Sequence, residues 1–168
     1  MVMPAWAQSG ADATSDPFGW LQRNLGGAAC VVYDVGPSAQ RLEHVTENTE
    51  VQFDGCRMTL QQAAVRGSHS EVRTYHVPLA ALDAGAVTSF AGFVLPEGWT
   101  SAGDVPTHTI QLAVPGGQRL IESSVETFDG TAPRQSRTHA VDMLVRHQEN
   151  ADQIVRALRR AIEQCRTP

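Results

Sequence analysis

The chain contains no lysine, and all 13 basic residues are arginine. Schiff-base enzymes need an amine nucleophile, and P-loop proteins need a lysine on the bound phosphates, so both classes are excluded. The glycine-rich motifs that bind dinucleotides and nucleotides are missing as well. We therefore expect no cofactor.

Long apolar runs are missing too. No stretch approaches the roughly 18 apolar residues that span a bilayer, so we expect no membrane insertion. The formal net charge is -5, so the chain lacks the overall basic character of a nucleic-acid-binding protein. What the chain does have is a hydrophobic fraction of 42% over 168 residues, which is enough for one domain with its own core.

Arginine is concentrated towards the end of the chain. Residues 129–168 hold 7 arginines against 5 acidic residues, whereas residues 1–128 hold 6 against 13. The arginine-rich end is interpreted as the solvated face of a helix. The alternative is an anion or partner site, for which Arg156 and Arg160 are the candidates.

The first residues indicate export. Ala5 and Ala7 form the small-x-small pattern of a signal-peptidase site that would cut before Gln8, and a polar stretch continues to Ser15. Only seven residues precede the cut, so residues 1–15 are interpreted as a signal-peptide remnant and disordered leader. A chance match is the alternative. We expect a bacterial exported protein, periplasmic or secreted, with residues 16–168 as its single domain.

Three cysteines are present, and none belongs to a C-x-x-C motif, so no thioredoxin-like or zinc-ribbon site is expected. Cys56 shares a predicted strand face with apolar residues, and Cys165 lies on the apolar face of the last helix. Both are expected to point into the core. We therefore predict a Cys56–Cys165 disulfide that leaves Cys30 unpaired; the alternative is three buried free thiols.

The hydrophobic pattern predicts strands between two helices. Asp16 and Pro17 begin a short helix that stops at Gly26. Residues 79–85 are expected to form a helical turn, and 96–106 and 129–137 to form loops. Apolar residues then recur at helical spacing from Ala151 to Cys165, which predicts an amphipathic C-terminal helix. The predicted strands are residues 31–35, 45–53, 56–65, 72–79, 87–95, 107–114, 118–128 and 138–145.

This order resembles the pleckstrin-homology-like superfold and small exported bacterial domains of unknown function. The resembling segments are 55–60 on a strand, 76–83 at a strand end and 151–165 on the last helix. The resemblance implies a single antiparallel β-barrel or strongly bent sheet of about seven or eight strands, with the C-terminal helix on its open end. It brings no catalytic residues. Lipid-binding members use a basic loop, but the turn at 66–70 has one arginine, so phosphoinositide binding is not expected.

Histidine is the richest source of catalytic chemistry. His69, His76 and His108 are the candidates for a metal site or a small hydrolase, although the H-E-x-x-H and G-x-S-x-G motifs are both missing. Histidines on a sheet face are the alternative. Glu122 and Glu126 flank a serine on one strand face, and a solvated sheet face explains them.

Binding is therefore predicted ahead of catalysis. Trp99, in the glycine-rich loop, is the candidate anchor for a partner, and a tryptophan folded over the sheet edge is the alternative. The expected ligand is an envelope protein, a peptide or an apolar small molecule. The alternative function is a histidine-dependent hydrolase or metal-binding enzyme. The oligomeric state is left open.

Overall fold

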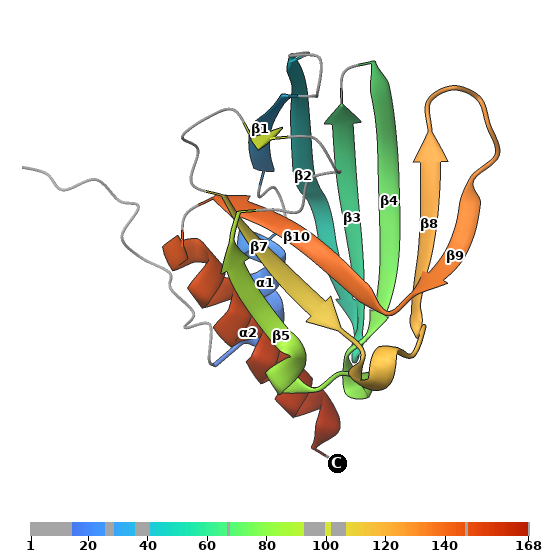
Figure 1. Ribbon diagram of the computed structural model, residues 1–168. Helices are drawn as coiled ribbons and strands as arrows, with labels where there is room; N and C mark the ends of the chain where they lie inside the picture. The colour runs from blue at the N-terminus through green and yellow to red at the C-terminus, as the bar shows by residue number, and fades with distance from the viewer. Residues whose placement is uncertain are drawn as a thin grey trace, which may run out of the picture.

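The computed structural model describes residues 15–25, 29–35, 41–66, 68–92, 100–101, 107–146 and 148–167. In these residues two antiparallel sheets lie between an N-terminal and a C-terminal helix (Figure 1). The mainly β fold with a helix at each end was predicted from the hydrophobic pattern and is confirmed. Neither described helix is long and apolar enough to cross a membrane.

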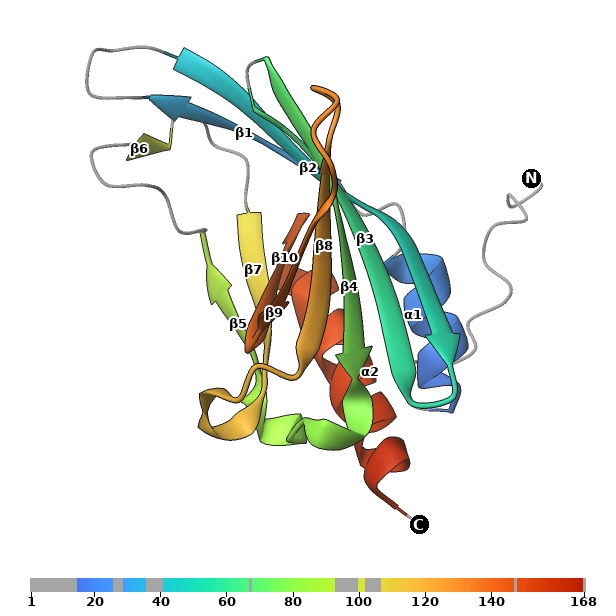
Figure 2. The same ribbon diagram turned by 90° about the vertical axis from the view of Figure 1, so that its right-hand side faces the viewer.

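The larger sheet has seven strands in the order β6-β1-β2-β3-β4-β8-β9. A register shift at Asn48 and Glu50 marks a bulge in β2, and Figure 2 shows this strand bending along its length. The strands in chain order are β1 (Ala29–Val35), β2 (Arg41–Asp54), β3 (Arg57–Arg66), β4 (His69–Pro78), β6 (Thr100–Ser101), β8 (Ile121–Thr127) and β9 (Arg134–Thr138).

The smaller sheet has the order β10-β7-β5 and lies obliquely across the larger one (Figure 1). A single residue, His139, separates β9 from β10, so the chain passes directly from one sheet to the other. The fold is therefore two sheets among the described residues, and a closed barrel is not confirmed. The strands are β5 (Val87–Ala91), β7 (Thr107–Ala113) and β10 (Ala140–Arg146).

The two helices pack on each other and on the sheets. Helix α1 (Pro17–Asn24) begins as predicted, because the Asp16 side chain accepts a hydrogen bond from the Gly19 amide at 3.0 Å. Helix α2 (Gln148–Arg166) contacts α1 and the smaller sheet. Its buried residues are Ala151, Ile154, Val155, Ala157, Leu158, Ala161 and Ile162.

Strand alternation along β3, β4 and the start of β8 gives the larger sheet a buried face and a more exposed face. Met58, Leu60, Val77 and Ile121 are buried in the core with the residues of α2. The residues between them in sequence point the other way. We refer to that second face as the outer face, and it carries the candidate site. Three short 3-10 turns connect the strands, and those at Leu79–Ala81 and Ala84–Ala86 fall where a helical turn was predicted.

Cys56 and Cys165 lie at disulfide distance, with their Cα atoms 5.6 Å apart. This is the pairing predicted from the sequence, but the expected burial of Cys56 is wrong. Cys56 is exposed in the two-residue turn between β2 and β3, two positions before Met58, the first buried residue of β3. Cys165 is half-buried and packs against the core from the end of α2. The disulfide therefore fastens α2 to a hairpin turn at the edge of the core.

One predicted loop is a strand. Residues 129–137 were expected to be irregular, yet Arg134–Thr138 pairs with β8 as β9. Every residue from Arg134 to Arg137 is exposed. The segment therefore lacks the alternation of apolar and polar residues from which strands are predicted. The predicted strand at 87–95 ends at Ala91 in the described part, and residues 93–95 lie outside it.

Candidate functional site

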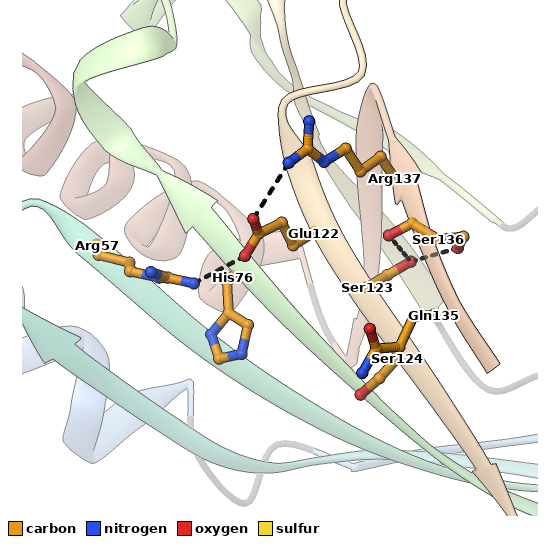
Figure 3. A pocket seen from close by; sticks show the side chains of 8 residues that line it. All are labelled: Arg57, His76, Glu122, Ser123, Ser124, Gln135, Ser136 and Arg137. Carbon is orange, nitrogen blue, oxygen red and sulfur yellow. Dashed lines mark hydrogen bonds and ion pairs between the residues drawn. The ribbon is translucent and has the colours of Figure 1, made fainter. Parts of the chain in front are cut away.

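A polar pocket opens on the outer face of the larger sheet, across β3, β4, β8 and β9. Its volume is about 520 Å³. Figure 3 shows its side chains, with arginines on two sides of one glutamate. The lining residues are Arg57, His76, Glu122, Ser123, Ser124, Gln135, Ser136 and Arg137.

The strand register assembles this pocket. His76 on β4 pairs with Glu122 on β8, which in turn pairs with Arg137 on β9. Two positions further along, Thr74, Ser124 and Gln135 form the next row on the same face. Residues directly opposite one another in adjacent strands have Cβ atoms roughly 5 Å apart, so polar side chains from three strands converge.

Glu122 is the centre of the charge arrangement. Its carboxylate lies 2.9 Å from the guanidinium of Arg57 and 3.6 Å from that of Arg137. The three side chains are about half exposed, so each ion pair contributes little to stability. Two arginines share a single carboxylate, which leaves one net positive charge in the pocket at neutral pH. The pocket is therefore suited to a second carboxylate, which arginine binds through two parallel hydrogen bonds.

Some of the remaining pocket groups are hydrogen-bonded. His76 Nδ1 lies 3.0 Å from the hydroxyl of Thr59, and the hydroxyls of Ser123 and Ser136 lie 2.8 Å apart. Among the described residues, His76 makes no hydrogen bond to Ser123, Ser124 or Ser136. The pairing of a base with a nucleophile that activates a serine is therefore not formed.

A second polar cluster lies on the inner face of β4. Glu71 is buried and pairs with Arg73, and His69 Nε2 lies 3.4 Å from the same carboxylate. Burial alone would lower the pKa of Arg73, but the neighbouring Tyr75 and Glu71 outweigh it and raise the pKa. Since Arg73 compensates the charge of the buried Glu71 while its own side chain is 46% exposed, the cluster is explained as a satisfied, partly buried ion pair.

The histidines proposed from the sequence do not come together. His69 and His76 occupy opposite ends of β4 and opposite faces of its sheet, and His108 lies on β7 in the smaller sheet. Within the described ranges no three histidine, cysteine, aspartate or glutamate side chains are grouped as metal ligands. Only His76 takes part in the pocket.

The partner-binding candidates lie elsewhere. Arg156 and Arg160 are exposed on α2, and Arg160 pairs with Glu163 at 3.4 Å. Neither of them lines the pocket. Trp99 lies outside the described residues, so its predicted role as an anchor stays a prediction. Arg57 and Arg137 were not singled out from the sequence, because their meeting at Glu122 depends on the register of strands that are distant in the chain.

The turn that leads into β9 is held by Asp129. Its carboxylate accepts hydrogen bonds from the hydroxyl of Thr127 at 2.6 Å and from the hydroxyl and amide of Thr131 at 2.7 and 3.0 Å. These hydrogen bonds, first those from Thr127 and then those from Thr131, lower the pKa of Asp129 to about 2. The neighbouring Phe128 is 77% exposed, so the ordered turn also presents an aromatic side chain to solvent.

We expect this turn to depend on pH only in strong acid. A lowered folded-state pKa means that the Asp129 carboxylate stabilises the turn above its ordinary pKa of 3.8, and that this contribution is lost as pH falls from about 4 towards about 2. Carboxyl NMR should give a midpoint near 2 for Asp129. A Thr127→Val, Thr131→Val protein should move the midpoint back towards 3.8, and an unchanged midpoint would contradict the assignment.

Comparisons of this chain with models of protein families, with curated proteins and with solved structures give no match. The function has to be argued from the site itself.

Proposed function

We propose that this domain is a non-enzymatic binding module whose ligand presents a carboxylate to the pocket between Arg57 and Arg137. The observation that carries the proposal is the sharing of Glu122 by both arginines. A ligand carboxylate meets two guanidinium groups that Glu122 already orients. Little side-chain ordering is then needed on binding, which favours affinity.

Binding is favoured over catalysis by the state of the pocket groups. His76 is hydrogen-bonded to Thr59, and Ser123 to Ser136, so His76 does not activate a pocket serine as a general base. The alternative is a hydrolase or metal-binding enzyme that uses His69, His76 or His108. Their positions on two faces and two sheets do not favour a shared metal site.

Export to the periplasm or the outside of the cell is part of the proposal. Disulfides persist in oxidising compartments, and the Cys56–Cys165 pair fits such a compartment. The signal-peptide interpretation of residues 1–15 points the same way but lies almost wholly outside the described residues. The ligand classes that then carry carboxylates are peptides and envelope proteins. A pleckstrin-homology-like ancestry is a further proposal, supported by the antiparallel sheets with a C-terminal helix.

The pocket is tested with two short peptides that differ by one charge. We expect acetyl-Thr-Glu-Thr-amide to shift the backbone NMR signals of His76, Glu122 and Arg137, and to bind more tightly than acetyl-Thr-Gln-Thr-amide. Exposed charge pairs contribute about 0.2–1 kcal/mol each, so an Arg57→Gln, Arg137→Gln protein should bind the glutamate peptide roughly 2- to 30-fold more weakly.

The matched control is an Arg156→Gln, Arg160→Gln protein, which loses the same charge on α2. It should bind the glutamate peptide as the unmodified protein does. An equal loss of binding in both proteins would show that the effect comes from overall charge or from α2. That result would contradict the pocket as the binding site.

A further inference from the structure

We propose that the ligand is an extended segment of a partner protein, which adds as a strand to the free edge of β9 and places an acidic side chain beside Arg137. This inference rests on the proposed function and adds the class of partner and the way it binds. β9 is the last strand of the larger sheet, and no described strand pairs with its other side.

The ladder shows which backbone groups of β9 face outwards. The Leu79 amide donates to the Cys56 carbonyl, so odd-numbered residues of β4 bond to β3 and even-numbered residues bond to β8. His76 and Glu122 are therefore a hydrogen-bonded pair, so the even-numbered residues of β8 bond to β4. The odd-numbered residues of β8 bond to β9, which makes Ser123 and Ser136 a hydrogen-bonded pair. The amide and carbonyl groups of Gln135 and Arg137 therefore point away from the sheet.

These outward groups have no partner in the described part of the chain, whereas each edge of the smaller sheet receives a side-chain hydrogen bond. At the β5 edge, Arg159 donates to the Val87 carbonyl at 2.9 Å. At the β10 edge, Gln62 donates to the Asp142 carbonyl at 3.0 Å. Proteins usually protect free strand edges, because such edges pair with other chains. An uncovered edge next to a polar pocket is the arrangement that strand addition uses.

The positive charge on β9 favours an acidic partner segment at this edge. Gln135 and Arg137 line the pocket on the outer face, and Arg134 adds a second positive charge to the same short strand. Alternate side chains of an added strand fall on the outer face beside them, so an acidic residue there reaches Arg137. A second copy of β9 would bring four arginines together. The charge therefore favours an acidic extended peptide over self-association.

Peptide length and backbone methylation test strand addition. The probe is acetyl-Thr-Val-Thr-Glu-Thr-Val-Thr-amide, which extends the tripeptide on both sides of the glutamate. We expect it to bind at least about tenfold more tightly than the tripeptide, since each added backbone hydrogen bond contributes about 0.5–1.5 kcal/mol. N-methylation of one alternate set of amides should remove this gain. Methylation of the opposite set, which faces solvent, should leave the gain unchanged.

A variant pair tests the edge from the protein side. Gln135→Pro removes one outward N–H without breaking a bond to β8, and an extended Arg134 tolerates the proline. Gln135→Ala loses the same side chain but keeps the N–H. We expect the heptapeptide to bind Gln135→Pro roughly 2- to 12-fold more weakly than Gln135→Ala, with equal thermal unfolding temperatures for the two proteins.

The outcomes separate the two proposals. If the tripeptide and the heptapeptide bind equally tightly, or if N-methylation of neither set of amides weakens heptapeptide binding, strand addition is overturned and the carboxylate pocket stays in place. Failure of the tripeptide to shift the pocket signals overturns the pocket instead. A dimer that forms through β9 in the absence of peptide, seen by sedimentation and lost in Gln135→Pro, would also overturn the proposed partner.

Discussion

Removal of the Cys56–Cys165 disulfide is expected to lower the free energy of unfolding by up to about 4–5 kcal/mol. The two cysteines are 109 residues apart, so the bond closes most of the domain into a loop. In the chain-entropy account, such a bond stabilises the fold by restricting the unfolded chain, and the effect grows with loop length. Domains of this size have about 5–15 kcal/mol of stability, so the loss is a large fraction.

Urea unfolding of a Cys56→Ser, Cys165→Ser protein measures this effect. The midpoint should fall well below that of the oxidised protein, and the oxidised protein with added reductant should fall to a similar value. The internal control is reductant added to the double variant, which should change nothing. A double variant as stable as the oxidised protein would show that the bond contributes no stability.

Leu158→Ala is expected to be the most damaging single change in α2, at about 3–5 kcal/mol. Leu158 is fully buried in the core, and its helix contacts α1 and the smaller sheet. Its truncation removes apolar contacts and leaves a cavity, because a packed core closes only partly around the missing atoms.

Arg156→Ala is the matched control on the same helix. Arg156 is exposed and two positions away, so its loss should change the free energy of unfolding by no more than about 0.5 kcal/mol. Guanidinium unfolding of the two variants against the unmodified protein decides the point. Similar losses in both variants would mean that the α2 packing described above is incorrect.

The parts predicted from the sequence are those that local pattern determines. The C-terminal helix follows from apolar residues at helical spacing, and the N-terminal helix from the cap at Asp16 and the proline after it. The cysteine pairing followed from the same patterns, although Cys56 itself lies in an exposed turn. For the two helices, neighbours within a few positions carry the information, whereas the cysteine pairing joins residues 109 positions apart and rested partly on the wrong expectation that Cys56 is buried.

The candidate site could not be predicted from the sequence, because its residues are distant in the chain. Arg57 and Glu122 are 65 positions apart and meet only because β3, β4 and β8 pair in one register. β9 is exposed along almost its whole length, so its strand conformation comes from β8 and leaves no hydrophobic signal. The histidines were overvalued because sequence distance says little about which face or sheet a residue occupies.

If the domain is exported as proposed, the position of the disulfide also constrains the order of events during translocation. If the chain enters the oxidising compartment from its N-terminus, Cys56 arrives 109 residues before Cys165. During that interval Cys30 is already available as a partner for Cys56. The native bond can therefore form only after the segment from Cys56 to Cys165 has crossed, and an earlier bond between Cys30 and Cys56 would have to be reshuffled. Closure of the native bond would then be favoured by a thiol–disulfide exchange partner.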